Sequence, residues 1–164
     1  MTAMNVDQIL SAFNETQVEY ILIGGMNFLL RHAPILTFDV DLWIDDTPEN
    51  RARCEAALAR LHAEWGERAS DWKRTGEFAP GWLERQTVYC LNSPHGAIDI
   101  FRTVTGLGDW HASAAKSVSE KTQNGTIYHG LSDADMLACQ LALEPGQRKM
   151  ERVTFLSQQG TSSS

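Results

Sequence analysis

The sequence lacks the features that mark several large classes of protein. Its 164 residues include three cysteines, Cys54, Cys90 and Cys139, with no C-x-x-C pair among them. This dispersed set argues against a disulfide framework or a cysteine zinc site and indicates reduced thiols. No apolar run approaches the length needed to span a bilayer, and the first residues lack the charged and apolar regions of a signal peptide. We therefore expect a cytoplasmic protein with no membrane partner.

The sequence also lacks an excess of positive charge. With 14 Lys and Arg against 21 Asp and Glu, its formal net charge is −7 and its pI is about 5.1. This balance argues against extensive nucleic-acid binding but is compatible with a small molecule or a metal-bound nucleotide. The sequence contains no G-x-S-x-G motif, Walker loop or Rossmann fingerprint. Hydrolase, P-loop and dinucleotide-binding functions therefore have no support from motifs.

The composition is that of a folded globular domain, with 43% apolar and 21% charged residues. We expect residues 1–158 to form a single domain and residues 159–164 to form a disordered tail. Apolar periodicity and turn residues predict helices over 6–13, 26–31, from 48 to 61, from 132 to 143 and over 148–158, and strands over 18–23, 35–44, 87–91 and 97–104. Asn5, Thr47 and Ser132 are the expected N-caps. Segment 65–85 is neutral overall, which favours a folded connection, and segment 105–130 is difficult to assign.

Two aspartates interrupt an apolar strand pattern. Asp39 and Asp41 alternate with Phe38, Val40, Leu42 and Ile44, so the acids should share one face of the strand and the apolar row the other. The strand rise places the two carboxylates about 7 Å apart, a spacing that suits shared coordination of hard divalent cations. A third acid, Asp99, lies between Ile98 and Ile100 on another expected strand. The alternative is that the pair faces solvent on an edge strand and that Asp99 marks a fraying end.

Gly24-Gly25, a short helix, Asp39-x-Asp41 and the later Asp99 together resemble the nucleotidyltransferase domain of the DNA polymerase β-like superfamily. The similarity covers roughly residues 18–104. It implies an α+β fold, with a nucleotidyltransferase-like mixed β-sheet packed against helices and C-terminal helices completing a minimal version. It also implies that Asp39 and Asp41 bind two Mg²⁺ ions, with Mn²⁺ as a possible substitute. Asp99 would share the catalytic metal and help to deprotonate the acceptor hydroxyl.

The resemblance also points to residues that bind the nucleotide. A helix that begins at Gly24-Gly25 would hold the triphosphate at its N-terminus, where glycine allows the backbone to approach closely. Many family members have Ser after the glycine pair, so Asn27 is the nearby candidate for a side-chain phosphate contact. Arg31 could pair with a phosphate or could equally stabilise the helix C-terminus. In the C-terminal helices, Gln140 and the run 148–150 stand where many small relatives carry a Lys and an R-x-K-D-like run.

Two further residues near the acids have a structural interpretation that we favour. Thr37 could orient a carboxylate, but ordinary β-propensity explains it as well. Trp43 should lie on the aspartate face, where it could stack on a base, although packing is the favoured interpretation.

The predicted activity is Mg²⁺-dependent transfer of a nucleoside monophosphate from an NTP to an acceptor hydroxyl, with release of pyrophosphate. The sequence does not identify the acceptor. Small antibiotic nucleotidyltransferases act on a small molecule, whereas toxin-type enzymes of toxin–antitoxin systems act on RNA or protein. The alternative is a non-catalytic binding protein that keeps the fold within a toxin–antitoxin-like complex. The sequence does not assign the preferred NTP or the oligomeric state.

Overall fold

The computed structural model describes residues 4–159, and these form a six-stranded mixed sheet flanked by helices. The strand order is β5-β6-β2-β1-β8-β7. The strands are β1 (Tyr20–Ile23), β2 (Asp39–Ile44), β5 (Val88–Leu91), β6 (Ala97–Phe101), β7 (Val118–Lys121) and β8 (Ile127–Gly130). Strand β2 pairs in parallel with β6 and antiparallel with β1. This mixed sheet with its helices confirms the predicted fold class.

Helices cover both faces of the sheet, and a hydrophobic core lies on each face. Because side chains alternate along a strand, apolar residues that are adjacent in β1 or β2 belong to different cores. One core contains Val40, Leu42 and Ile44 together with residues of α1 (Val6–Glu15) and α3 (Pro48–Arg60). The other contains Ile21, Ile23 and Trp43 and packs against α5 (Asp133–Leu141) and α6 (Met150–Gln159). Helix α4 (Trp110–Lys116) also packs on this second core, and α2 (Gly24–Arg31) contributes to both. The acids of β2 therefore lie on the face shared with α5 and α6.

Capping residues fix where several helices begin, as the sequence predicts. The Asn5 side chain accepts a hydrogen bond from the backbone N–H of Gln8. Thr47 caps α3 in the same way, and Pro48 occupies the first turn of that helix. Ser132 caps α5 through a 3.2 Å bond from the N–H of Asp135. These short local contacts satisfy N–H groups that have no partner within the helix.

Strand β2 is shorter than the sequence pattern predicts. It begins at Asp39, where β2 also gains its first pairing partner, Ala97 of β6. Phe38 is 74% exposed, so the apolar row has three members and the prediction that Phe38 belongs to it is wrong. The reason is that β6 itself starts at Ala97, so residues before Asp39 have no neighbouring strand to pair with. Strand β6 likewise ends at Phe101, earlier than predicted.

The segments that resisted assignment are folded. Residues 105–130 contain α4 and the β7–β8 hairpin, whose strand β8 extends the sheet in parallel with β1. Residues 64–85 form the short strands β3 (Glu64–Trp65) and β4 (Lys73–Arg74) and the 3-10 turns Ala69–Asp71, Thr75–Glu77 and Trp82–Arg85. A further 3-10 turn, Pro145–Gln147, joins α5 to α6. Trp65, Phe78, Trp82 and Tyr89 pack their rings together in this region. This confirms a folded connection.

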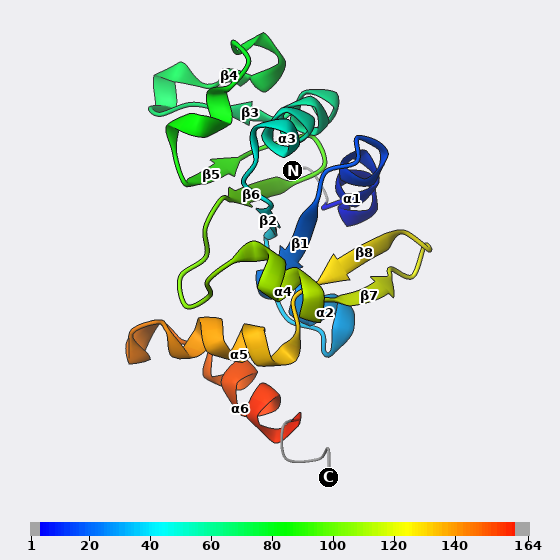
Figure 1. The fold of residues 1–164 in the computed structure, drawn as a ribbon, viewed down its shortest axis with the longest axis vertical. Coiled ribbons are helices and arrows are strands. Elements are labelled where there is room, and N and C mark those ends of the chain that lie inside the picture. Colours follow the sequence, from blue (N-terminus) through cyan, green and yellow to red (C-terminus); the bar gives the residue numbers. More distant parts are fainter. Residues whose placement is uncertain (1–3, 160–164) are drawn as a thin grey trace.

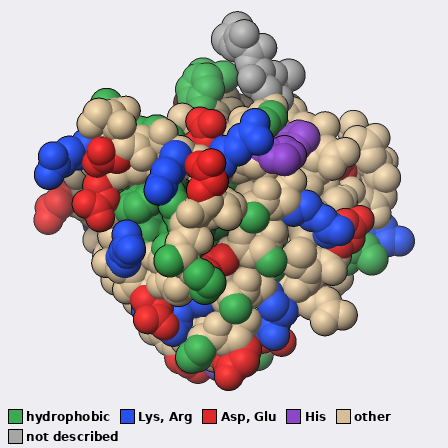
Figure 2. Space-filling view, turned by 90° about the horizontal axis from the view of Figure 1, so that it is seen from above, with side chains coloured by type: hydrophobic (Ala, Val, Ile, Leu, Met, Phe, Trp, Pro, Cys, Tyr) green, Lys and Arg blue, Asp and Glu red, His purple; other side chains and the backbone are tan. Residues whose placement is uncertain are grey.

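The short sheet β3–β4 and the helices α5 and α6 lie at opposite ends of the molecule, with the main sheet between them (Figure 1). Seen from the β3–β4 end, basic and acidic side chains are interspersed and form no continuous basic patch on this face (Figure 2). All three cysteines are free thiols, as expected. No helix among residues 4–159 is long and apolar enough to cross a bilayer. Helix α6 extends through Gln159, and residues 160–164 of the expected tail lie outside the described range.

Candidate metal and nucleotide site

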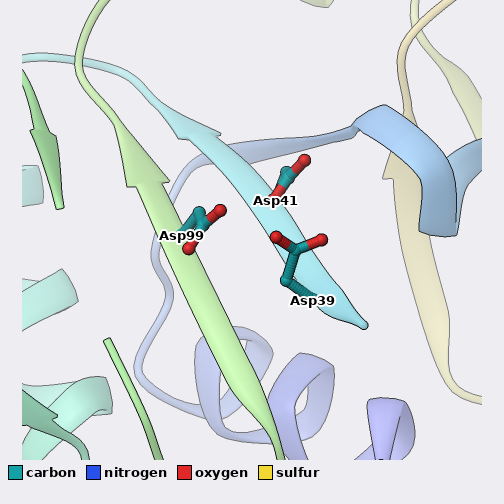
Figure 3. Close-up of side chains that lie close together, drawn as sticks. All are labelled: Asp39, Asp41 and Asp99. Carbon is teal, nitrogen blue, oxygen red and sulfur yellow. The ribbon is translucent and has the colours of Figure 1, made fainter. Parts of the chain in front are cut away.

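The three predicted acids converge on one point of the sheet. Strands β2 and β6 run side by side, and Asp41 is the register partner of Asp99. Asp39 lies two residues before Asp41 and therefore projects from the same face. One carboxylate oxygen from each of the three acids lies within 4.8 Å of those of the other two. Figure 3 shows the side chains approaching one another from the two neighbouring strands.

Crowding and burial make the charged forms of Asp41 and Asp99 unfavourable. Burial, followed by the charges of Asp39 and Asp99, raises the pKa of Asp41 to about 8. Burial, followed by a hydrogen bond and a charge from Asp39, raises the pKa of Asp99 to about 6. Within the described part of the chain, the Asp41 Oδ1 atom is buried and has no hydrogen-bond partner. The cluster consists entirely of carboxylate oxygen, which hard divalent cations prefer, so its residues fit such a cation.

The double glycine brings the N-terminus of α2 directly against Asp41. Gly24 has a φ of +71°, and a Cβ built on it would overlap the Asp41 carboxylate. A Cβ on Gly25 would lie 2.9 Å from Thr37 Oγ1 and 3.1 Å from Arg152 Nη2. Only glycine allows the backbone to pass this close to the acids. The free N–H groups of the first turn of α2 therefore lie beside the carboxylate cluster.

A cavity of about 440 Å³ opens beside Asp39 and Asp41. This volume lies within the range of small-molecule sites. The cavity is lined by Gly24 and Gly25, by the polar side chains of Thr37, Gln140, Lys149 and Arg152, and by apolar residues that include Phe28, Phe101, Val104, Met136 and Leu156. The site thus combines a carboxylate cluster, a helix N-terminus, two cations and an apolar wall.

Asn27 and Arg31 do not line this cavity, and their side chains already donate hydrogen bonds to other residues of the chain. The Asn27 side chain is fully buried and donates to the carbonyl of Leu131 at 3.1 Å and to Met136 Sδ at 3.2 Å. Arg31 donates to the same carbonyl and forms a 3.0 Å ion pair with Asp133. In this structure both side chains connect α2 to the segment between β8 and α5. Their contacts with a nucleotide remain a prediction.

Trp43 and Thr37 lie on the side of the sheet that carries the acids. Trp43 is buried in the core with α5 and α6, which confirms the packing interpretation. Its backbone carbonyl accepts a hydrogen bond from Trp110 Nε1. Thr37 precedes β2, and its hydroxyl donates to the Asp39 carbonyl at 3.5 Å, so it contacts the backbone of the site.

Sequence reasoning missed Arg152 as a site residue. Arg152 lies in the last helix, far along the chain from the acids, and reaches the cavity through the packing of α6 against α5 and α2. It also missed Cys90, the register partner of Asp99 on the edge strand β5. Burial and the neighbouring acids raise the pKa of the Cys90 thiol. The Arg152 contact joins distant segments, and no local pattern marks it. Cys90 and Asp99 face each other in the hairpin of the consecutive strands β5 and β6, whose register decides the pairing.

Comparisons with known proteins show the fold. No family model matches the sequence, and no curated protein matches it. Among solved structures, the chain is similar to ANT(2'')-Ia in complex with adenylyl-2''-tobramycin, with 14% identity, a TM-score of 0.58, and coverage of 94% of this chain and 86% of the other. It is also similar to a candidate nucleotidyltransferase, TM1012 from Thermotoga maritima, with 15% identity, a TM-score of 0.54 and coverage of 95% and 88%. The chain therefore has a nucleotidyltransferase fold.

Proposed function

We propose that this protein is a metal-dependent nucleotidyltransferase that moves a nucleoside monophosphate from an NTP to an acceptor hydroxyl. The observation that carries the proposal is the convergence of Asp39, Asp41 and Asp99 beside the N-terminus of α2. Three like charges that are crowded and partly buried are unfavourable unless a cation binds between them. A triphosphate with its accompanying cation fits this arrangement, because the carboxylates can bind the cation and the N-terminus of α2 can bind the phosphates.

Each residue has a distinct part in the proposed reaction. Asp39 and Asp41 would hold Mg²⁺, and the first turn of α2 would bind phosphate oxygens. Bound there, a divalent cation would neutralise phosphate charge and make the acceptor hydroxyl easier to deprotonate. The acceptor oxygen attacks the α-phosphorus as the bond to the β-phosphate oxygen breaks, and pyrophosphate leaves. Asp99, on the neighbouring strand, would take the proton from the hydroxyl, the role that the resemblance implies.

The fold comparison supports this class of reaction and leaves several acceptor classes open. The solved relative ANT(2'')-Ia holds adenylyl-2''-tobramycin, an adenylylated antibiotic. In the present chain, the described residues that line the cavity include the cations Lys149 and Arg152 and no carboxylate besides Asp39 and Asp41. A polycationic antibiotic would gain little from such a lining, so the search for the acceptor should extend to neutral and anionic hydroxyl compounds, RNA and protein.

The test of the proposal is to follow labelled nucleotide. The protein is incubated with each α-³²P-labelled NTP, Mg²⁺ or Mn²⁺ and a cell extract, and the labelled product and released pyrophosphate are measured. Asp41→Asn should abolish labelling. Asp109→Asn is the matched control, because Asp109 is exposed and its side chain caps no helix. Equal labelling by wild type and Asp41→Asn would contradict the proposal. Metal-dependent NTP binding without any transfer would favour the non-catalytic alternative.

A further inference from the structure

Arg152 reaches from α6 to the start of α2. It lines the same cavity as Gly24, Gly25, Asp39 and Asp41. Its guanidinium lies 6.0 Å from the centre of the Phe28 ring, and its Nη2 atom lies 3.1 Å from a Cβ built on Gly25. The guanidinium therefore lies beside the first turn of the helix expected to bind phosphate.

This is an electrostatically unfavourable place for an unpaired cation. The N-terminus of a helix carries partial positive charge and favours anions. Burial lowers the pKa of Arg152, whereas the charges of Asp41 and Asp39 raise it. Within residues 4–159, Arg152 forms no ion pair with any carboxylate and donates no side-chain hydrogen bond, whereas Arg31 and Arg51 form both. An anion between the guanidinium and the helix N-terminus would satisfy both positive groups.

The packing of α6 fixes where Arg152 can reach. The Gln140 side chain of α5 accepts a 2.7 Å hydrogen bond from the backbone N–H of Lys149, directly before α6. Arg152 lies one turn further along, and its own N–H donates to the Lys149 carbonyl. Gln140 is thus a positioning residue for the start of α6.

We propose that Arg152 binds the β- and γ-phosphates of the triphosphate and stabilises the leaving pyrophosphate, an inference that rests on the proposed function. The position of Arg152 relative to the three aspartates determines which phosphates it can contact. Arg152 lines the cavity together with Asp39 and Asp41, whereas Asp99 is not among the described residues that line it. Because Asp99 would serve the acceptor and the α-phosphate, a guanidinium on the α2 side faces the opposite end of the triphosphate. Arginine suits this role because its fork of donors can bind two phosphate oxygens at once.

The inference is tested by nucleotide affinity, which needs no acceptor and no turnover. Calorimetry with Mg²⁺ measures the affinity of wild type, Arg152→Gln and Arg152→Lys for an NTP, for its NMP and for pyrophosphate. Arg152→Gln should weaken binding of the NTP and of pyrophosphate about 10- to 100-fold, the loss expected for a charge-assisted phosphate contact, and should leave NMP binding unchanged. Arg152→Lys should lose less affinity for the NTP and for pyrophosphate, because lysine keeps the positive charge but lacks the paired N–H donors of the guanidinium. Arg68→Gln, at an exposed position, is the control.

The outcomes separate this inference from the function on which it rests. If Arg152→Gln binds NTP within about twofold of wild type, a difference too small for a charge-assisted contact, the role of Arg152 is wrong and the proposed function stands. An equal loss for NTP and NMP would also overturn it, because a contact to the distal phosphates cannot affect an NMP. If the wild type itself binds no NTP with Mg²⁺ or Mn²⁺, the proposed function fails. Should Arg152→Gln not fold, Arg152→Lys supplies the same comparison between NTP and NMP.

Discussion

Replacing Asp41 with asparagine should remove a pH dependence of stability from the metal-free protein. The pKa of Asp41 is raised from 3.8 to about 8 in the folded state. Between these values the folded protein holds a proton that the unfolded chain has released. The free energy of unfolding must therefore fall as the pH rises through this window. Asparagine has a similar shape and no titration, so the variant should not show this fall.

The magnitude follows from the linkage between proton binding and stability. Each pH unit in which one proton is held only by the folded state changes the free energy of unfolding by about 1.4 kcal/mol. Between pH 6 and pH 8 the slope declines as Asp41 ionises, and the total loss from this residue is about 2 kcal/mol. Asp41→Asn shows no such loss, so its stability relative to wild type should rise by about 2 kcal/mol between pH 6 and pH 8.

The assay is urea denaturation in EDTA at closely spaced pH values for wild type, Asp41→Asn and the control Asp109→Asn. The control should follow the wild-type curve. Adding Mg²⁺ with an NTP at about 100 times its dissociation constant should stabilise only the wild type, by about 2.7 kcal/mol, which is enough to offset the loss between pH 6 and pH 8. A flat wild-type curve between pH 6 and pH 8, or the same slope in Asp41→Asn, would refute the reasoning.

Three other substitutions distinguish the parts of the site. Asp99→Asn should leave NTP affinity largely intact and abolish transfer, because its role falls in the transition state, and equal transfer rates for variant and wild type would contradict this. Asp39→Asn should weaken both NTP affinity, measured by calorimetry, and product formation, and retained affinity would count against a role in holding the cation. Gly24→Ala should lower the free energy of unfolding by at least about 1–2 kcal/mol, because alanine is strained at positive φ and its Cβ would overlap the Asp41 carboxylate. Gly108→Ala, where an added Cβ would meet nothing within 4 Å, is the matched control in urea denaturation, and equal losses for the two would contradict the close approach.

Local patterns were sufficient to place the three acids on strands. Side chains alternate along a strand, so the sequence around Val40 and Leu42 already places Asp39 and Asp41 on one face. The two isoleucines beside Asp99 mark its strand in the same way. What the sequence leaves open is which strands are neighbours. The resemblance implied that the three acids belong to one site, and the register of β2 and β6 brings them together.

Features that depend on contacts between distant segments could not be predicted. Phe38 continues the apolar alternation, yet it is exposed because β6 offers no partner before Ala97. The β7–β8 hairpin is polar because it lies at the edge of the sheet, where only part of each strand is buried. Arg152 belongs to the site only because α6 folds back against α2 and α5. Each of these outcomes follows from tertiary packing, which periodicity along the chain does not encode.

The most direct test of the central claim is a calorimetric titration with an NTP analogue that cannot be cleaved between its α- and β-phosphates. The claim is that Asp39 and Asp41 hold the divalent cation through which a nucleoside triphosphate binds. Wild-type protein should bind the analogue with Mg²⁺ or Mn²⁺ and lose this binding in EDTA. Asp41→Asn should bind weakly in both conditions. Binding that is equally tight in EDTA, or equally tight in Asp41→Asn, would contradict the claim.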